Sequence, residues 1–144
     1  MVQGPRTVSH DPGTLALELS NQAIGRAGEF CAAAIFEMHG VITTHVDVHG
    51  VDLWCETPSG RRVTVQVKTT RAPTDSKQKR PPRYFFQIKP KQGVVADIYC
   101  FVALDLGRVR LLSSGELIKR STRSHSVSYF TEEDMVADIR RYLY

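Results

Sequence analysis

Three residues in the middle of the chain could together support chemistry on a phosphate group: Asp52, Gln66 and Lys68. Side chains alternate between the two faces of a strand, so Gln66 and Lys68 project from the same face of the strand that they share. A hairpin with the three-residue loop 58–60 would set Asp52 opposite Gln66, at the ~5 Å spacing of a cross-strand pair. Carboxylate and amide oxygens suit Mg²⁺, which fills its remaining sites with water and phosphate oxygens. We therefore expect a carboxylate, an amide and an ammonium group to meet at a site for a divalent cation.

Positive charge is concentrated next to these residues. The segment from Arg61 to Lys91 contains ten Lys and Arg residues and one acid, Asp75, whereas the whole chain carries a net charge of +4. Such a block fits a surface that binds a polyanion, because each cation placed on a phosphate releases condensed counterions. The alternative is a solvated loop rich in Lys and Arg, and charge alone does not separate the two.

The overall composition is that of a soluble globular domain. The chain has 144 residues, of which 42% are hydrophobic and 24% charged, and this excludes a membrane protein, a disordered tail and a collagen-like fibre. We expect a flexible N-terminal arm at 1–19 and a single domain at 20–144 with a basic loop at 70–83. The N-terminus lacks the apolar stretch of a secretory signal, so a cytoplasmic, nucleoid-associated protein is expected. The three cysteines have no C-x-x-C spacing and are expected to be buried, reduced thiols.

The spacing of apolar residues predicts the elements that would position these side chains. From Asn21 to His39 apolar residues recur at three- and four-residue steps, which predicts an amphipathic helix ended by Gly40. The expected apolar face consists of Ile24, Ala27, Phe30, Cys31, Ala34, Ile35 and Met38. After Gly40 the period changes to two. Strands are expected at Val41–Val46, Val51–Glu56, Val63–Thr69, Tyr84–Lys89, Asp97–Leu104 and Val109–Leu112.

The order and composition of these strands predict a mixed sheet. The first three should form an antiparallel meander, and Asp97–Leu104 is almost continuously apolar, as expected of a strand buried on both faces. A short final helix should begin at Thr131, which forms a capping box-like pair with Asp134. The sequence therefore predicts an α/β domain with a mixed central β-sheet flanked by helices.

Three segments in this order resemble the PD-(D/E)XK nuclease superfamily: Gly28-Glu29 on the expected helix, Gly50-Val51-Asp52-Leu53 at the second strand and Val65-Gln66-Val67-Lys68-Thr69 on the third. The chain resembles its small members, those similar to Holliday-junction resolvases and to homing endonucleases encoded by group I introns. The resemblance covers Ile24 to Leu104 and implies a restriction-endonuclease-like core. Val51 replaces the proline of the pattern, and Gln66 replaces an acid, as glutamine does in some similar intron-encoded enzymes.

The resemblance implies a Mg²⁺-dependent endodeoxyribonuclease, in which Mn²⁺ can replace Mg²⁺. It implies that the metal ligands are Asp52, Gln66 and Glu29, and that Lys68 completes the catalytic set. Lys68 would orient or deprotonate the attacking water, or offset the charge that develops on the phosphate oxygens. Because cutting both strands of a duplex or junction needs two active sites, a homodimer or tetramer is expected.

DNA contacts are expected from the basic segment that follows the third strand. The residues expected to hold the DNA backbone are Arg71, Lys77, Lys79, Arg80 and Arg83. In the next strand, alternation puts Phe85 in the core and leaves Tyr84 and Phe86 to stack on unpaired bases. The substrate would be duplex or branched DNA, and the reaction a junction-resolving, homing or restriction-like cleavage.

Alternatives from other functional classes stay open. The domain could be a nucleic-acid-binding module whose nuclease site has decayed, with Gln66 as the trace of that loss. It could also be a subunit of a larger defence or transposition complex. Separately, His45, Asp47 and His49 could bind zinc, although no fourth ligand has suitable spacing, and His49 could instead approach the scissile phosphate beside Asp52.

Overall fold

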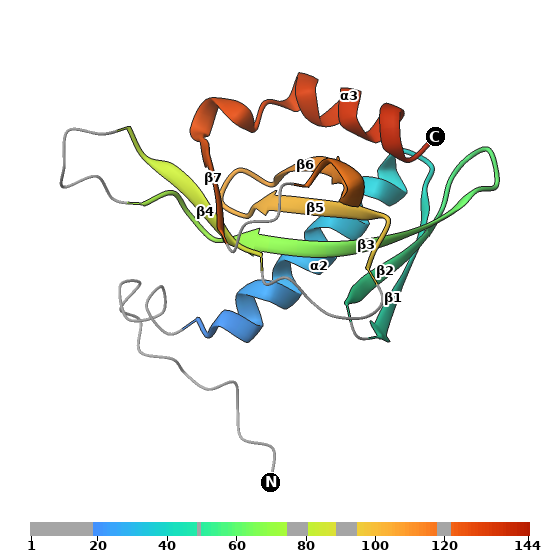
Figure 1. Cartoon of the computed structure of the whole chain (residues 1–144), viewed down its shortest axis with the longest axis horizontal. Coiled ribbons are helices and arrows are strands. Elements are labelled where there is room, and N and C mark those ends of the chain that lie inside the picture. The colour runs from blue at the N-terminus through green and yellow to red at the C-terminus, as the bar shows by residue number, and fades with distance from the viewer. Residues whose placement is uncertain (1–18, 49, 75–80, 89–94, 118–121) are drawn as a thin grey trace, which may run out of the picture.

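The computed structural model describes residues 19–48, 50–74, 81–88, 95–117 and 122–144 of the chain (Figure 1). In chain order, the elements are α2 (Asn21–Met38), β1 (Ile42–Val48), β2 (Val51–Glu56), β3 (Arg62–Thr70), β4 (Arg83–Gln87), β5 (Ile98–Ala103), β6 (Arg108–Ser113), the 3₁₀ turn η1 (Ser114–Glu116), β7 (Thr122–Ser126), the 3₁₀ turn η2 (Val127–Tyr129) and α3 (Glu132–Tyr142). Apart from Leu19, the expected arm at 1–19 lies outside the described residues. Within the described ranges, no helix combines the length and the apolar character needed to cross a bilayer.

The strands form two sheets, and the larger one is mixed, as predicted. Its order is β1-β2-β3-β5-β6, with β3 and β5 parallel and the other neighbours antiparallel. The predicted antiparallel meander of β1, β2 and β3 is therefore confirmed. β4 and β7 pair antiparallel in a separate two-stranded sheet. The fold is α/β with a mixed central sheet flanked by helices, which confirms the predicted class.

The turn between β2 and β3 fixes the register of the meander. Gly60 has a φ of 86°, in the left-handed region that favours glycine, and its N–H donates to the Thr57 carbonyl at 2.8 Å. The Thr57 N–H donates to the Arg61 carbonyl, also at 2.8 Å, and closes the predicted three-residue loop. Glu56 consequently pairs with Arg62, and the ladder continues from there along both strands.

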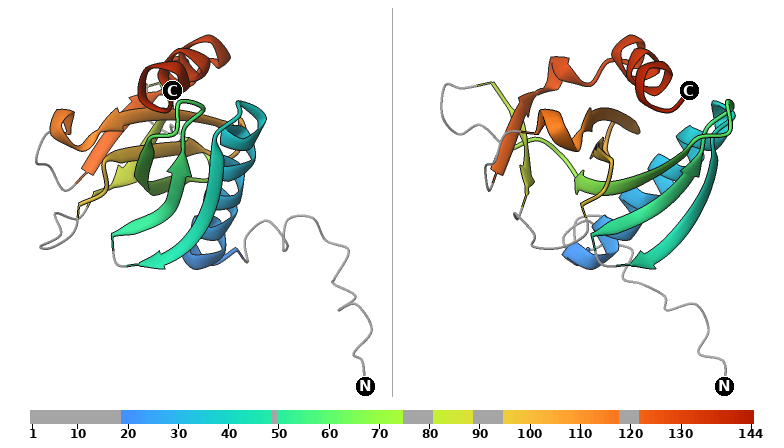
Figure 2. Two further views of the ribbon diagram at one scale, coloured as in Figure 1. Left: turned by 90° about the vertical axis from the view of Figure 1, so that its right-hand side faces the viewer. Right: turned by 45° about the vertical axis from the view of Figure 1, so that its right-hand side comes forward.

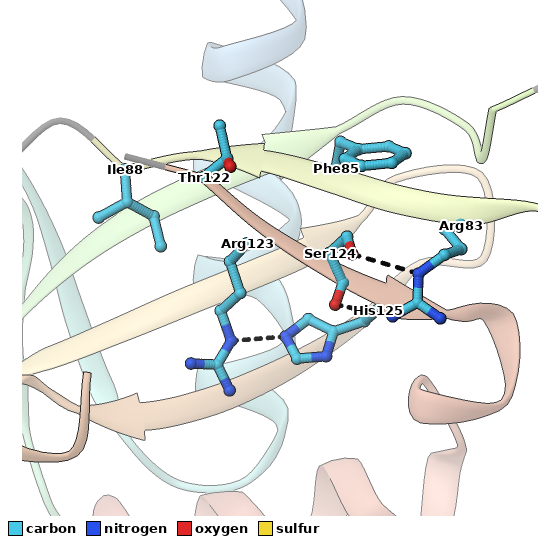
Figure 3. Close-up of a pocket in the computed structure, with 7 residues that line it drawn as sticks. All are labelled: Arg83, Phe85, Ile88, Thr122, Arg123, Ser124 and His125. Carbon is cyan, nitrogen blue, oxygen red and sulfur yellow. Dashed lines mark hydrogen bonds between the residues drawn. The ribbon is translucent and has the colours of Figure 1, made fainter. Parts of the chain in front are cut away.

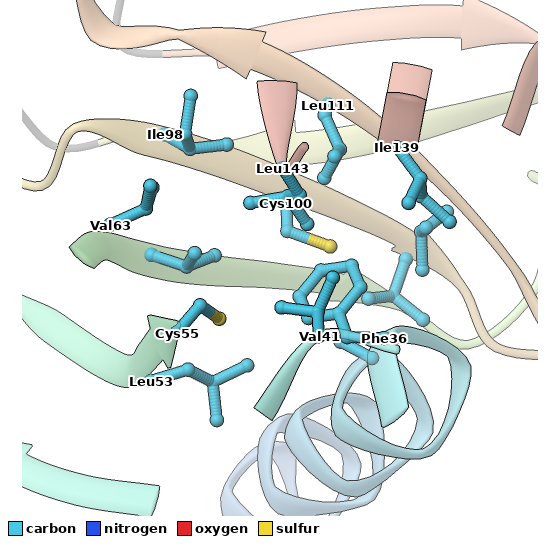
Figure 4. Close-up of a cluster of buried hydrophobic side chains, with 14 of the residues drawn as sticks. Phe36, Val41, Leu53, Cys55, Val63, Ile98, Cys100, Leu111, Ile139 and Leu143 are labelled. Carbon is cyan, nitrogen blue, oxygen red and sulfur yellow. The ribbon is translucent and has the colours of Figure 1, made fainter. Parts of the chain in front are cut away.

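β5 divides the interior into two cores. Its six residues are all buried, and they point alternately to opposite faces of the sheet. One face belongs to the larger core, which α2 and α3 both cover (Figures 2 and 4), and the other belongs to an aromatic core under the β4–β7 sheet. The first set is Ile98, Cys100 and Val102, and the second is Tyr99, Phe101 and Ala103.

The three cysteines are free thiols, as predicted. Cys55 and Cys100 are buried in the larger core, and Cys31 is partly buried at its edge. Burial raises the pKa of the Cys55 thiol to about 11 and that of Cys100 well above its ordinary value. Both buried thiols therefore stay protonated at neutral pH and act as small apolar side chains.

Helix α2 begins where predicted but buries a different face. The Ser20 hydroxyl accepts the N–H of Ala23 at 3.0 Å and caps the first turn. The predicted apolar face includes Phe30 and Met38, whose side chains are 56% and 84% exposed, so that prediction is wrong. The buried residues are Gly28, Ala32 and Phe36. Gly28 and Ala32 are small residues, and Gly28 lies where the helix comes closest to the sheet. The spacing of large hydrophobic residues does not indicate which small residues are buried.

The sequence predicts the second sheet only in part. β4 occurs where a strand is expected, but its alternation is opposite to the prediction: Tyr84 and Phe86 are buried, and Phe85 is 52% exposed. Its partner β7 has the sequence Thr-Arg-Ser-His-Ser, which contains no apolar residue from which a period could be recognised. Pairing with β7 over the aromatic core determines which residues of β4 face inward.

Helix α3 has the predicted start. The Thr131 hydroxyl accepts the N–H of Asp134 at 3.1 Å, acidic residues occupy the first turn, and Arg140 and Arg141 occupy the last. This distribution of charge complements the helix dipole and stabilises the helix that closes the larger core.

Candidate active site

β2 and β3 separate at the point where the candidate residues lie. The last pair of their ladder is Leu53 with Val65, which has the predicted register, and Asp52 and Gln66 are the next residues beyond the end of the ladder. The Asp52 carboxylate accepts a hydrogen bond from the backbone N–H of Val67 at 2.7 Å. This bond holds the carboxylate against β3 where the two strands no longer pair with each other.

Gln66 and Lys68 lie on the face of β3 that continues into the aromatic core. In the parallel pairing with β5, Gln66 lies beside Tyr99 and Lys68 beside Phe101. Gln66 is 6% exposed, one of two buried polar residues in the described chain, and Lys68 is partly exposed. A buried amide costs free energy unless a partner compensates it. Gln66 is therefore a largely buried amide on the same face of β3 as Lys68.

Glu29 reaches the cleft of Asp52 from α2. The two carboxylates line an open cleft of about 620 Å³ between α2, β1 and β2. Glu29 Oε1 lies 3.7 Å from Nε2 of His45, whose ring packs against Phe30 with centroids 4.7 Å apart. The contact of His45 with Glu29 could not be predicted from the sequence, because no local pattern links a helix residue to a strand residue 16 positions further along the chain.

Gly28 allows α2 to lie directly against β3 at this point. A Cβ at position 28 would lie 2.6 Å from Cγ2 and 2.7 Å from Cβ of Thr69, and it would also overlap Oγ1 of that residue. A side chain at position 28 would thus push the helix and the strand apart. Because Glu29 is the next residue, the close approach at Gly28 also sets the position of the Glu29 carboxylate beside β1 and β2.

The donor groups at this cleft suit a hard divalent cation. Glu29 and Asp52 offer carboxylate oxygens, and Mg²⁺ commonly uses one or two protein carboxylates together with water and phosphate. Gln66 is not among the described residues that line the cleft, because alternation turns it to the face of β3 opposite to Thr69, which contacts α2. In the part of the chain that the structure describes, no three His, Cys, Asp or Glu side chains are grouped so that they could hold a metal ion.

The zinc site considered for His45, Asp47 and His49 falls largely outside the structure. His45 is the member whose side chain is described, and it lies beside Glu29. The position of His49 and the side chain of Asp47 lie outside the described residues. The zinc hypothesis, and the hypothesis that His49 approaches the scissile phosphate, stay predictions.

The expected DNA-backbone contacts are partly covered by the structure. Lys77, Lys79 and Arg80 lie outside the described residues. Arg71 directly follows β3, and Arg83 begins β4, where its carbonyl accepts the N–H of Thr74 at 2.9 Å. The basic segment therefore begins directly after β3, the strand that contains Lys68, and ends at β4.

Tyr84 requires a correction. Its side chain is fully buried, and its hydroxyl donates to the Asp105 carboxylate at 2.8 Å. Burial and the Asp105 carboxylate raise the pKa of Tyr84. A ring enclosed in the aromatic core offers no face to a nucleobase, and the same holds for Phe86, which is 1% exposed. Phe85, expected in the core, is the exposed ring of this strand.

No protein-family model matches this chain, and no curated protein matches its sequence. Its fold is similar to the solved structure of a bacterial homing endonuclease, I-Ssp6803I. The similarity covers 74% of this chain and 75% of that chain, with a TM-score of 0.62 and a sequence identity of 16%. At this identity the comparison shows a shared, nuclease-like fold.

Proposed function

We propose that this protein is a metal-dependent DNA endonuclease of the PD-(D/E)XK kind, which hydrolyses phosphodiester bonds in duplex or branched DNA. One observation carries the proposal: the Asp52 carboxylate accepts the N–H of Val67, the residue of β3 between Gln66 and Lys68, where β2 and β3 separate. Glu29 lines the same cleft as Asp52. Two carboxylates, an amide oxygen and an amine are suited to metal-assisted hydrolysis of a phosphate ester.

The shared fold adds support of a different kind. The similar solved structure is that of a homing endonuclease. Because one fold can carry many activities, the residues at the cleft, and not the fold, decide between an enzyme and a binding protein.

Asp52 and Gln66 would hold Mg²⁺ or Mn²⁺, with Glu29 as a further ligand, either directly or through water. When bound, the ion supplies Lewis-acid polarisation of the scissile phosphate and lowers the pKa of a water molecule beside it. The hydrogen bond from Val67 fixes one oxygen of Asp52, so the carboxylate needs little rearrangement to act as a ligand. Gln66 supplies an oxygen without negative charge, and we expect weaker metal affinity than an acid would give.

Lys68 would act on the substrate. Its ammonium group can donate to a non-bridging oxygen of the scissile phosphate and offset the charge that develops there, or it can orient the attacking water. Water adds to phosphorus while the bond to the leaving sugar oxygen breaks, so no covalent enzyme intermediate is required.

The proposed substrate also determines the assembly. Cleavage of both strands of a duplex or junction calls for two active sites, and a homodimer or tetramer supplies them by symmetry. The basic residues that would hold the DNA backbone are Arg71, Lys77, Lys79, Arg80 and Arg83. Junction-resolving, homing and restriction-like enzymes share this chemistry and differ in how two subunits are arranged.

A second candidate is a nucleic-acid-binding module that has lost cleavage. Gln66 stands where the resemblance calls for an acid, and no group of three potential His, Cys, Asp or Glu ligands occurs among the described residues. Such a module would keep its affinity for DNA through the basic residues but would not cut in the presence of Mg²⁺ or Mn²⁺.

Incubation of the protein with a four-way junction, a plain duplex and a single strand distinguishes the two candidates. We expect cleavage of the duplex or the junction with Mg²⁺ or Mn²⁺ and none with EDTA. Gln66→Glu should preserve or increase this cleavage, because it restores a negative charge at the proposed metal site. Tight DNA binding without cleavage by either protein would reject the endonuclease in favour of the binding module.

A further inference from the structure

A second groove lies along β7, away from the cleft that Glu29 and Asp52 line. It has a volume of about 460 Å³ and is lined by residues of β4 and β7 and by Ile88 (Figure 3). Ile88 lies at one end and Arg83 at the other, with Arg123, Ser124 and His125 between them. We call this feature the β7 groove.

The β7 groove is positively charged. Arg83 and Arg123 line it, and none of its described lining residues is acidic. Arg83 donates from Nε and Nη2 to the side chain and carbonyl of Ser124, at 3.2 and 3.1 Å. Arg123 Nε donates to Nε2 of His125 at 2.6 Å. These bonds hold both guanidinium groups in place, and each group has further N–H donors outside them.

His125 supports this arrangement as a neutral acceptor. Its ring stacks on Tyr129, with centroids 3.8 Å apart and planes 7° apart. Burial, together with the positive charges of Arg123, Arg83 and Arg110, lowers the pKa of His125 to about 4. The imidazole therefore accepts from Arg123 at neutral pH, and the charge of the groove comes from its guanidinium groups.

Phe85 adds an exposed aromatic ring to the groove. It is 52% exposed and pairs across the two-stranded sheet with Ser124, the residue that Arg83 also contacts. Phe85 and Ser124 lie on the outer face of this sheet, whereas Arg123 and His125 alternate to the face over the aromatic core. An exposed ring beside a fixed guanidinium group, here that of Arg83, is the combination with which proteins bind unpaired nucleotides, because bases stack on the ring and phosphates pair with arginine.

The β7 groove lies on the side of the central sheet to which Lys68 belongs. Arg123 lies over the ring of Phe101, 5.6 Å from its centroid, and Phe101 is the β5 neighbour of Lys68. The hydroxyl of Thr70, at the end of β3, donates to the carbonyl of Phe85. The groove and Lys68 therefore lie on the same side of the central sheet, one strand apart.

We propose that the outer face of the β7 groove binds an unpaired segment of a DNA strand, with phosphate held by Arg83 and a base stacked on Phe85. The inference that this segment belongs to the strand being cut rests on the proposed endonuclease function. The inference that the groove binds single-stranded DNA is independent of that function, because the binding depends on residues that take no part in cleavage.

Binding of a fluorescent single-stranded oligonucleotide to the full chain, measured by anisotropy in EDTA, tests the inference. We expect Phe85→Ala to weaken binding by about fivefold or more, the effect of losing one base stack. Arg83→Gln should weaken it by a similar factor and reduce the slope of log K against log salt by about 1. Arg140→Gln is the matched control, an exposed arginine in the last turn of α3, and should bind within about twofold of wild type.

Phe85→Ala replaces an exposed side chain and should leave folding intact even if Arg83→Gln does not. Wild-type affinity in Phe85→Ala would overturn the inference, as would tighter binding of an acidic peptide of equal length than of the oligonucleotide. The assay also separates the two proposals. Loss of binding in Phe85→Ala in a protein that never cuts DNA would support the β7 groove while rejecting the endonuclease.

Discussion

Gly28→Ala should push α2 away from β3, and it should lower both the stability of the protein and the affinity of the candidate active site for a divalent cation. The new Cβ would lie 2.6 Å from Cγ2 and 2.7 Å from Cβ of Thr69, whereas non-bonded carbon atoms prefer about 3.5–4.0 Å. Rotation of the Thr69 side chain can move Cγ2, but Cβ is attached directly to the strand backbone. The helix or the strand must therefore shift by on the order of 1 Å to relieve the overlap.

Two opposing effects set the size of the change. Overpacking of a tight contact costs about 1–3 kcal/mol, and replacing glycine by alanine inside a helix gains about 0.5–1 kcal/mol. We therefore expect the free energy of unfolding to fall by about 1–2 kcal/mol. For a domain of this size that corresponds to a decrease of roughly 2–8 °C in the melting temperature.

Thermal unfolding followed by circular dichroism measures this change. Gly25→Ala is the matched control, because Gly25 lies one turn earlier in α2 and a Cβ there would have no heavy atom within 4 Å. Helix propensity alone should make Gly25→Ala slightly more stable than wild type. A lower melting temperature for Gly28→Ala and a higher one for Gly25→Ala would separate the effect of the contact with Thr69 from the effect of the helix propensity of alanine.

The same displacement should move Glu29, so Gly28→Ala should also bind Mn²⁺ more weakly than Gly25→Ala. A melting temperature for Gly28→Ala equal to or above that of Gly25→Ala would refute the reasoning, because it would mean that β3 does not restrict position 28.

Three further predictions concern other residues. The free energy of unfolding should decrease as the pH falls from about 6.5 towards 4, because the lowered pKa of His125 in the folded protein means that the imidazole takes up a proton more readily in the unfolded chain. Denaturant unfolding at pH 7 and pH 4.5 should show a smaller decrease in the free energy of unfolding for His125→Gln than for wild type. Tyr84→Phe removes the hydrogen bond to Asp105 and should lower the free energy of unfolding by about 1 kcal/mol, and an unchanged urea midpoint would count against this role. Gln66→Glu should tighten Mn²⁺ binding, measured by electron paramagnetic resonance, and an unchanged affinity would show that residue 66 is not a ligand.

The sequence predicts the central meander well because its determinants are local. The turn at Gly60 and the alternation of β2 and β3 fix the register of the ladder as far as Leu53 and Val65. The buried face of α2 depends instead on contact with Thr69, a residue far along the chain, and hydrophobic spacing alone selects the wrong side. The orientation of β4 likewise depends on its partner β7, whose polar sequence contains no periodic signal.

Part of the geometry of the candidate site could be predicted from local patterns. Strand alternation predicts that Gln66 and Lys68 share a face of β3, whereas Glu29 enters through a resemblance, and the roles of Asp52 and Glu29 as metal ligands stay predictions. The contact of Glu29 with His45 and the position of Arg123 in the β7 groove arise from tertiary packing. Neither has a local sequence pattern from which it could be inferred.

The rate of DNA cleavage by Asp52→Asn under single-turnover conditions with Mg²⁺ tests the central claim most directly. Asparagine keeps an oxygen that can accept the N–H of Val67, so the fold should persist, but the negative charge at the proposed metal site is lost. Glu56→Gln is the matched control, since Glu56 is an exposed acid on the same face of β2. We predict that Glu56→Gln cleaves at the wild-type rate and that Asp52→Asn is slower by about 100-fold or more. Cleavage by Asp52→Asn at the wild-type rate would contradict the account.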